Sequence, residues 1–159
     1  KERGEEISYD RVIAEATLSD IRSVIDVDDS SFCNPDCMEE SIAEYCHKHH
    51  LRVPVSQGEF VRCVIESLAH RYKLGVEQMN RCLPVPVKQL HIIGGGCQNR
   101  LLNQLTANAL GIPVYAGPVE ATAIGNILVQ AKAQGEIDTW EELKEIIINS
   151  VKPQVYYPE

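Results

Sequence analysis

Apolar residues recur at helical spacing over most of the chain, so the sequence predicts a helix-rich protein. The longest predicted helix begins after Ser56 and extends to about Cys82, and its apolar stripe is wider than a surface helix needs. Ser56 followed by Glu59 forms a capping box, which marks the start of this helix. Ser8 and Thr139 are expected to cap the first and last helices. Together the apolar positions predict helices over residues 7–18, 37–49, 57–82, 100–110, 121–134 and 140–148.

Strand patterns are scarce by comparison. Apolar and β-branched residues predict short strands over residues 87–93 and 114–116, and a further one over 24–27. The tail from Val151 to Glu159 contains two prolines and is predicted to be irregular. The order of the elements indicates an α/β protein. A complete doubly wound domain normally has more strands, which indicates that the chain is one part of a larger sheet.

Three consecutive glycines, Gly94, Gly95 and Gly96, separate a predicted strand from the helix that follows Asn99. A turn without Cβ atoms lets backbone amides approach a ligand closely, and a helix start favours negative charge, so a nucleotide or another phosphorylated ligand fits the pattern. The turn lacks the Lys and the Ser or Thr of a P-loop, and Asn99 stands where the dinucleotide fingerprint has its third glycine. An Asn amide suits a base edge or a ribose. The alternative is a tight strand-to-helix connection that binds nothing.

Composition and charge narrow the class of protein. A chain of 159 residues is long enough for one domain with a sizeable core. The net charge of −8 argues against a nucleic-acid partner, which needs a basic face. The sequence has neither a long apolar run nor the architecture of a signal peptide, so no membrane partner and a cytoplasmic location are expected.

Six cysteines are many for a cytosolic chain, and most lie among apolar neighbours, which favours buried, reduced thiols. Cys46 and Cys63 are expected to come close, because one ends a helix and the other lies in the next, and a disulfide between them is the less favoured alternative. The stretch from Cys33 to His50 also allows a zinc site, although its spacing matches no common structural zinc pattern. No metal-ligating residue is therefore assigned.

Four segments that begin at the glycine turn follow one another along the chain: Ile92–Asn99 (IIGGGCQN), Leu105–Asn108 (LTAN), Ile112–Val114 (IPV) and Glu120–Asn126 (EATAIGN). This series resembles the C-terminal signature of the FGGY carbohydrate kinases. The run from Gly94 to Leu105, the segment from Ala116 to Ala121 and the turn from Phe32 to Pro35 are most similar to the rhamnulokinase subfamily. The resemblance covers nearly the whole chain.

The resemblance implies a fold and a place within it. FGGY kinases have two domains with an actin-like, ribonuclease-H-like ATPase fold, so residues 1–159 would be the C-terminal part of the second domain, helix-rich with a small sheet. In the family, Gly94, Gly95, Gly96 and Asn99 correspond to positions at the nucleotide, with Asn99 at the adenine. The sugar-binding domain and the catalytic Asp precede the segment that matches this chain, and none of its seven Asp residues occupies that motif. No catalytic residue is therefore assigned here, and Glu120 is interpreted as a structural residue at a helix start.

For the whole enzyme, the resemblance implies transfer of the γ-phosphoryl group of ATP to the 1-hydroxyl of L-rhamnulose, with Mg²⁺, giving ADP and L-rhamnulose 1-phosphate. The chain alone is expected to be inactive. Two alternatives stay open: another FGGY kinase, acting on xylulose, fuculose or glycerol, and a module that binds nucleotide or protein without catalysis.

Overall fold

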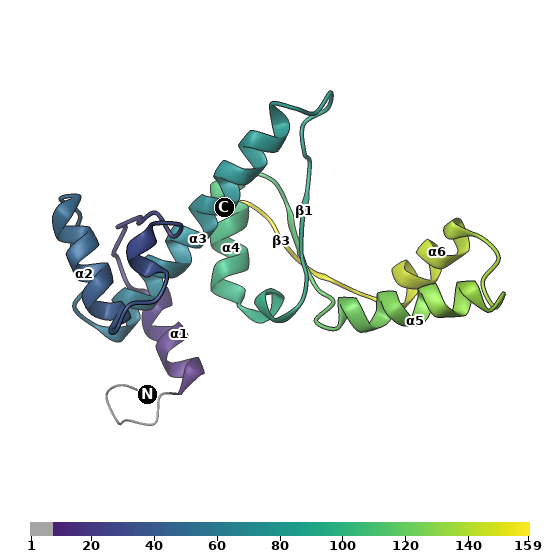
Figure 1. The fold of residues 1–159 in the computed structure, drawn as a ribbon, viewed down its shortest axis with the longest axis horizontal. Helices are drawn as coiled ribbons and strands as arrows, with labels where there is room; N and C mark the ends of the chain where they lie inside the picture. Colours follow the sequence, from purple (N-terminus) through teal and green to yellow (C-terminus); the bar gives the residue numbers. More distant parts are fainter. Residues whose placement is uncertain (1–7) are drawn as a thin grey trace. The chain divides into compact units, whose positions relative to one another are not determined.

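The computed structural model describes residues 8–159 and divides the chain into two compact units, one ending at Pro84 and the other beginning at Val85. The first unit contains α1 (Tyr9–Leu18), η1 (Ser30–Phe32), α2 (Met38–Lys48) and α3 (Gln57–Asn80) (Figure 1). The second contains β1 (Leu90–Ile92), η2 (Gly95–Gln98), α4 (Arg100–Leu110), β2 (Val114–Ala116), α5 (Ala121–Ala133), α6 (Trp140–Ser150) and β3 (Gln154–Tyr156).

In the first unit, α1 packs closely against the beginning of α3. Gly58 makes this approach possible, because a Cβ placed there would lie 2.6 Å from the Cβ of Glu15. Arg62 is buried in the same region, where its guanidinium lies 2.8 Å from the Glu66 carboxylate. The cap that Ser56 provides is confirmed, since its hydroxyl accepts the N–H of Glu59 at 3.2 Å.

The prediction of a strand over residues 24–27 is wrong. Residues 24–26 have no regular secondary structure and residue 27 lies in a turn, and the segment pairs with no strand of the described chain because side chains bind its amides instead. The N–H of Ile25 donates to the Ser67 hydroxyl at 2.9 Å, and the N–H of Asp26 donates to the Tyr45 hydroxyl at 3.2 Å. Ile25 thereby joins the core of this unit, together with Ile42, Cys46 and Cys63.

The second unit is built on a three-stranded sheet in the order β1-β2-β3. β1 and β2 are parallel, with Leu90 opposite Val114, and β3 runs antiparallel to β2, with Tyr156 opposite Val114. The tail was expected to be irregular, and β3 corrects that prediction. The free edge of β2 offers a row of backbone partners, and the extended backbone of Gln154–Tyr156 satisfies them.

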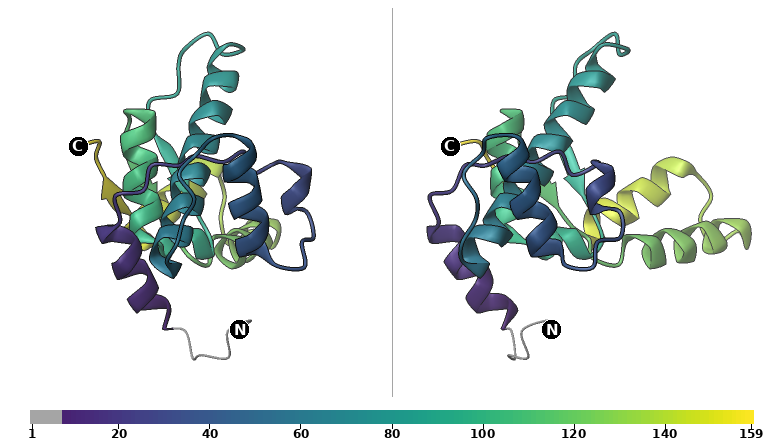
Figure 2. Two further views of the ribbon diagram at one scale, coloured as in Figure 1. Left: turned by 90° about the vertical axis from the view of Figure 1, so that its left-hand side faces the viewer. Right: turned by 60° about the vertical axis from the view of Figure 1, so that its left-hand side comes forward.

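Helix α4 packs against β2 and β3, and the core between them contains Cys97, Ala107, Val114, Ala116 and Tyr156. The buried residues of α4 include two polar ones, Asn103 and Thr106. α5 and α6 lie at an angle to each other (Figure 2, right), and the hydroxyl of Thr139 caps α6 by accepting the N–H of Glu142 at 3.1 Å. No residue of α5 is buried by the described part of the chain.

Most predicted helices begin and end within a few residues of their observed bounds, and α3 continues through Gly75 without a break. Ser8 occupies the N-cap position of α1 but makes no side-chain cap, and Ile7 lies outside the described residues. The strand predicted over 87–93 forms only at Leu90–Ile92. Over residues 8–159, no helix combines the length and the apolar character needed to cross a membrane.

Candidate functional site

The glycine turn lies at the carboxyl ends of the parallel strands β1 and β2. Backbone pairing continues beyond both strands, since the N–H of Gly117 donates to the Ile92 carbonyl at 2.8 Å and the N–H of Gly94 donates to the Pro118 carbonyl at 3.1 Å. The loop after β1 and the loop after β2 are therefore held side by side. In open α/β sheets this edge is where ligands bind.

Gly94 gives the turn its shape. Its backbone has φ 75° and ψ −163°, a region that is occupied almost only by glycine. The chain leaves β1 through this residue and enters η2 directly afterwards, and the N–H of Cys97 donates back to the Gly94 carbonyl at 3.1 Å. A side chain at position 94 would strain the backbone even though a Cβ there would meet nothing within 4 Å.

Gly95 and Gly96 have non-positive φ values, so within the glycine turn only Gly94 has the positive φ that favours glycine. Both Gly95 and Gly96 are exposed, and a Cβ at Gly95 would meet nothing within 4 Å. Within residues 8–159 their N–H groups have no hydrogen-bond acceptor. The turn therefore presents a bare backbone with two unused donors.

Asn99 ends the turn and begins α4. Its side-chain oxygen accepts the N–H of Leu102 at 3.0 Å, which makes it the N-cap of the helix. Its own N–H donates to the Gly96 carbonyl at 3.2 Å. The side-chain NH₂ has no acceptor among the described residues, so it is the group that Asn99 can offer to a ligand. This cap was not predicted from the sequence, although an Asn before an apolar run at helical spacing is a known cap signal.

Asn103 is a residue of this region that the sequence did not single out. It is fully buried, and its side-chain NH₂ donates to the Cys97 carbonyl in the turn at 2.8 Å. The available signal was a polar amide on the apolar side of α4, next to Leu102 and one turn before Ala107. Glu120, which follows the second loop, is exposed and makes no side-chain cap on α5.

Three of the six cysteines belong to the buried cores of the two units. Cys46 and Cys63 lie in contact in the core of the first unit, as expected, and both are free thiols. Burial raises the pKa of Cys46, and it raises the pKa of Cys63 to about 12, so both are protonated at neutral pH. The zinc alternative finds no support, because no group of three or more His, Cys, Asp or Glu side chains in residues 8–159 could hold a metal ion. Only Cys46, Cys63 and Cys97 are buried, fewer than the sequence predicted.

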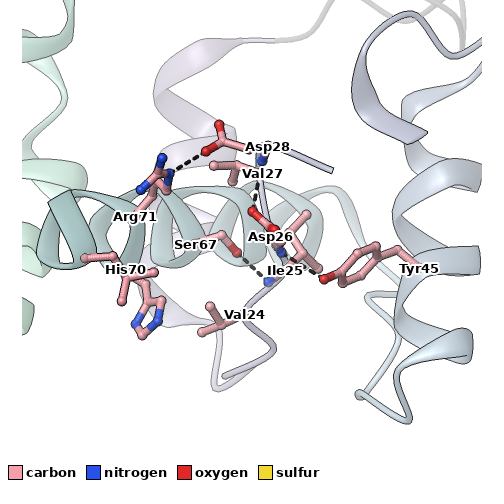
Figure 3. A pocket seen from close by; sticks show the side chains of 10 residues that line it. Val24, Ile25, Asp26, Val27, Asp28, Tyr45, Ser67, His70 and Arg71 are labelled. Atoms are coloured by element: carbon pink, nitrogen blue, oxygen red, sulfur yellow. Dashed lines mark hydrogen bonds and ion pairs between the residues drawn. The ribbon is translucent and has the colours of Figure 1, made fainter. Parts of the chain in front are cut away.

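A separate cavity of about 450 Å³ lies in the first unit, lined by the segment 24–28, Tyr45 and one side of α3. Arg71, Asp28, Ser67 and Tyr45 are each bonded within its lining, whereas His70 makes no marked contact with the other lining residues (Figure 3). Arg71 pairs with Asp28, and Ser67 and Tyr45 bind the backbone of the segment. These contacts tie the segment to α2 and α3, which is a structural task.

Comparison with known proteins shows which family the sequence matches. Residues 4–134 match the model of the FGGY family of carbohydrate kinases, C-terminal domain. A rhamnulokinase of Bacteroides thetaiotaomicron is 46% identical over 153 residues, which cover 96% of this chain and 32% of that protein. A rhamnulokinase of Bacillus subtilis is 36% identical over 153 residues, with the same coverage of 96% and 32%. The chain therefore spans about a third of the length of these relatives.

The fold agrees with the sequence match. The crystal structure of xylulose kinase from Rhodospirillum rubrum aligns with a TM-score of 0.50 and 21% identity, over 69% of this chain and 22% of that one. Helices that flank a small sheet, with a glycine turn after a parallel strand, are consistent with an actin-like ATPase domain. The chain belongs to the FGGY family of carbohydrate kinases and matches the C-terminal domain of that family.

Proposed function

We propose that the protein containing this chain is an ATP-dependent sugar kinase that phosphorylates the 1-hydroxyl of L-rhamnulose. The family supports a kinase, and the relatives named rhamnulokinase support the sugar. ATP would lose its γ-phosphoryl group to the sugar oxygen, the hydroxyl proton would pass to a base, and ADP and L-rhamnulose 1-phosphate would leave. This chain corresponds to the nucleotide side of the enzyme, and the base lies elsewhere in the polypeptide.

Within this proposal, Gly94, Gly95, Gly96 and Asn99 line the nucleotide site. The observation that carries the assignment is the bare, exposed backbone at Gly95 and Gly96, whose N–H groups have no acceptor in the described chain. They can donate to oxygen atoms of ATP, and the Asn99 side-chain NH₂ can donate to the adenine or the ribose. Phosphoryl transfer depends chiefly on positioning and on charge neutralisation, so this wall would contribute the orientation of ATP.

Mg²⁺ accompanies ATP in this proposal, but the described residues offer no cluster of ligands for it. Mg²⁺ in kinases is usually held by one or two carboxylates together with the substrate phosphates. The ligands would then come from ATP and from the remainder of the polypeptide, and no catalytic step is assigned to the metal through this chain.

The test uses the full-length protein with Gly95→Val. The valine side chain would occupy the space proposed for the nucleotide, so we expect the KM for ATP to rise about tenfold or more, while the KM for L-rhamnulose stays nearly unchanged. A loss of one or two hydrogen bonds at about 0.5–1.5 kcal/mol each accounts for a change of this size. An unchanged KM for ATP in the folded variant would refute the assignment of the turn.

Gly75→Val is the matched control. Gly75 is also a glycine whose added Cβ would meet nothing within 4 Å, but it lies in the C-terminal part of α3 and outside the turn. It should leave both KM values unchanged. A substrate panel of L-rhamnulose, xylulose, fuculose and glycerol separates the family alternatives by kcat/KM, and no ATP-dependent phosphorylation of any of them would favour a non-catalytic module.

A further inference from the structure

Asn103 is a polar side chain in a place where an apolar one would pack with less difficulty. It is completely buried on the side of α4 that faces the sheet, where Leu102 and Ala107 are also buried. Its side-chain oxygen is buried and has no hydrogen-bond partner in the described chain. A buried acceptor without a partner destabilises a fold, so the amide needs another reason to occupy this position.

The donor half of the same amide supplies that reason. The side-chain NH₂ reaches back from the first turns of α4 and donates to the Cys97 carbonyl at 2.8 Å. Cys97 is the third residue of η2, directly after Gly95 and Gly96, and its side chain belongs to the buried core of this unit. Asn103 therefore fixes the turn from its buried side, while the two glycines face outward.

We infer that Asn103 is a positioning residue for nucleotide binding, which acts by holding the Cys97 carbonyl and thereby the orientation of the Gly95 and Gly96 N–H groups. This inference rests on the proposed function of the turn. Asn99 holds the end of the turn through its cap on Leu102, and Asn103 holds its centre. Both ends of the contact lie within one helix and the turn that precedes it, so the effect needs no other part of the protein.

Thr106 provides a matched control on the same helix. It is also fully buried and polar, but its hydroxyl donates at 2.7 Å to the Leu102 carbonyl within α4, away from the turn. Thr106→Val removes one buried hydrogen bond of similar length without releasing the Cys97 carbonyl. If buried polar groups in α4 have only a structural role, substitutions at Asn103 and Thr106 should have similar effects on the KM for ATP. If Asn103 positions the turn, only its substitution should raise the KM for ATP.

The experiment uses the full-length protein with Asn103→Leu and measures three quantities. We expect the KM for ATP to rise about two- to tenfold, the size expected for one weakened hydrogen bond, with kcat and the KM for the sugar unchanged within about twofold. Without nucleotide, amide hydrogen exchange at Cys97 and Asn99, whose N–H groups donate to the Gly94 and Gly96 carbonyls, should become faster by about the same factor, because the turn opens more often. Thr106→Val should change neither the KM for ATP nor this exchange.

The possible results separate this inference from the proposed function. If the wild-type protein phosphorylates sugar and Asn103→Leu changes neither the KM for ATP nor the exchange at Cys97 and Asn99, the positioning role is overturned. If the wild-type protein shows no ATP-dependent activity, the proposed function fails. Unchanged amide exchange in Asn103→Leu would still show that Asn103 does not stabilise the turn. Asn103→Ala removes the same donor with a smaller side chain, so it replaces the leucine variant if the latter does not fold. A similar rise in the KM for ATP with Thr106→Val would also count against the inference.

Discussion

Gly94 and Gly95 are adjacent in the glycine turn, yet the structure predicts a large loss of stability for an alanine at Gly94 and almost none at Gly95. At Gly94 an alanine must adopt φ 75° and ψ −163°, which costs a non-glycine residue about 1–3 kcal/mol. An added Cβ meets nothing within 4 Å there, so the cost comes from the backbone alone. At Gly95 the Cβ also meets nothing and φ is not positive, so we expect Gly95→Ala to change stability by less than about 0.5 kcal/mol.

Urea unfolding of the full-length protein and of the two alanine variants, followed by circular dichroism, measures this difference. Gly94→Ala should lower the unfolding midpoint while the slope with urea stays constant, and Gly95→Ala should superimpose on the wild type. Equal destabilisation by both variants, or a larger loss at Gly95, would refute the description of the turn. The order of the two costs matters for the functional test as well, since a change in the KM for ATP at Gly95 is interpretable only if the fold is intact.

Three further predictions concern other parts of the chain. Asn99→Ala should destabilise α4 by about 0.5–2 kcal/mol through loss of the cap on Leu102, seen as a lower urea midpoint, and should raise the KM for ATP less than Gly95→Val does. The raised pKa of Cys63 means that the unfolded chain releases this proton at lower pH than the folded chain does, so the free energy of unfolding should fall as the pH rises from about 9 to 12. The free energy of unfolding of Cys63→Ala should fall less over that interval. Parallel plots of the free energy of unfolding against pH for the two proteins would contradict the burial of the thiol. The 159-residue chain with ATP, Mg²⁺ and L-rhamnulose should form no L-rhamnulose 1-phosphate in a chromatographic assay, and product formation by highly pure chain would contradict the placement of the catalytic base outside it.

Signals that act over a few residues were sufficient to predict much of the second unit. β2 was predicted with its observed bounds, and α4, α5 and α6 were located correctly, because the apolar spacing of a helix and a cap such as Thr139 are local in the sequence. The family could be identified for a similar reason, since its motifs are short and follow one another closely from Ile92 to Asn126.

Features that depend on distant partners were predicted less well. The strand at Gln154–Tyr156 forms because β2 has a free edge, and nothing in the tail itself indicates that edge. The segment 24–27 has the composition of a strand, but Ser67 and Tyr45 bind its amides in place of a neighbouring strand. The roles of the individual residues in the turn could not be predicted either, because the sequence does not distinguish the glycine that requires a positive φ from its neighbours.

The pairing of β3 with β2 also bears on how the second unit folds. Tyr156 faces Val114 from about 40 positions later in the chain, beyond two helices, whereas β1 and β2 are joined through the adjacent α4. Closing such a long loop has an entropic cost that must be met before the contact is gained, so the β1-α4-β2 part is expected to form first and β3 to dock last. Until then the edge of β2, with its buried Val114 and Ala116, is exposed to other chains, which makes this interval the one most prone to aggregation during refolding.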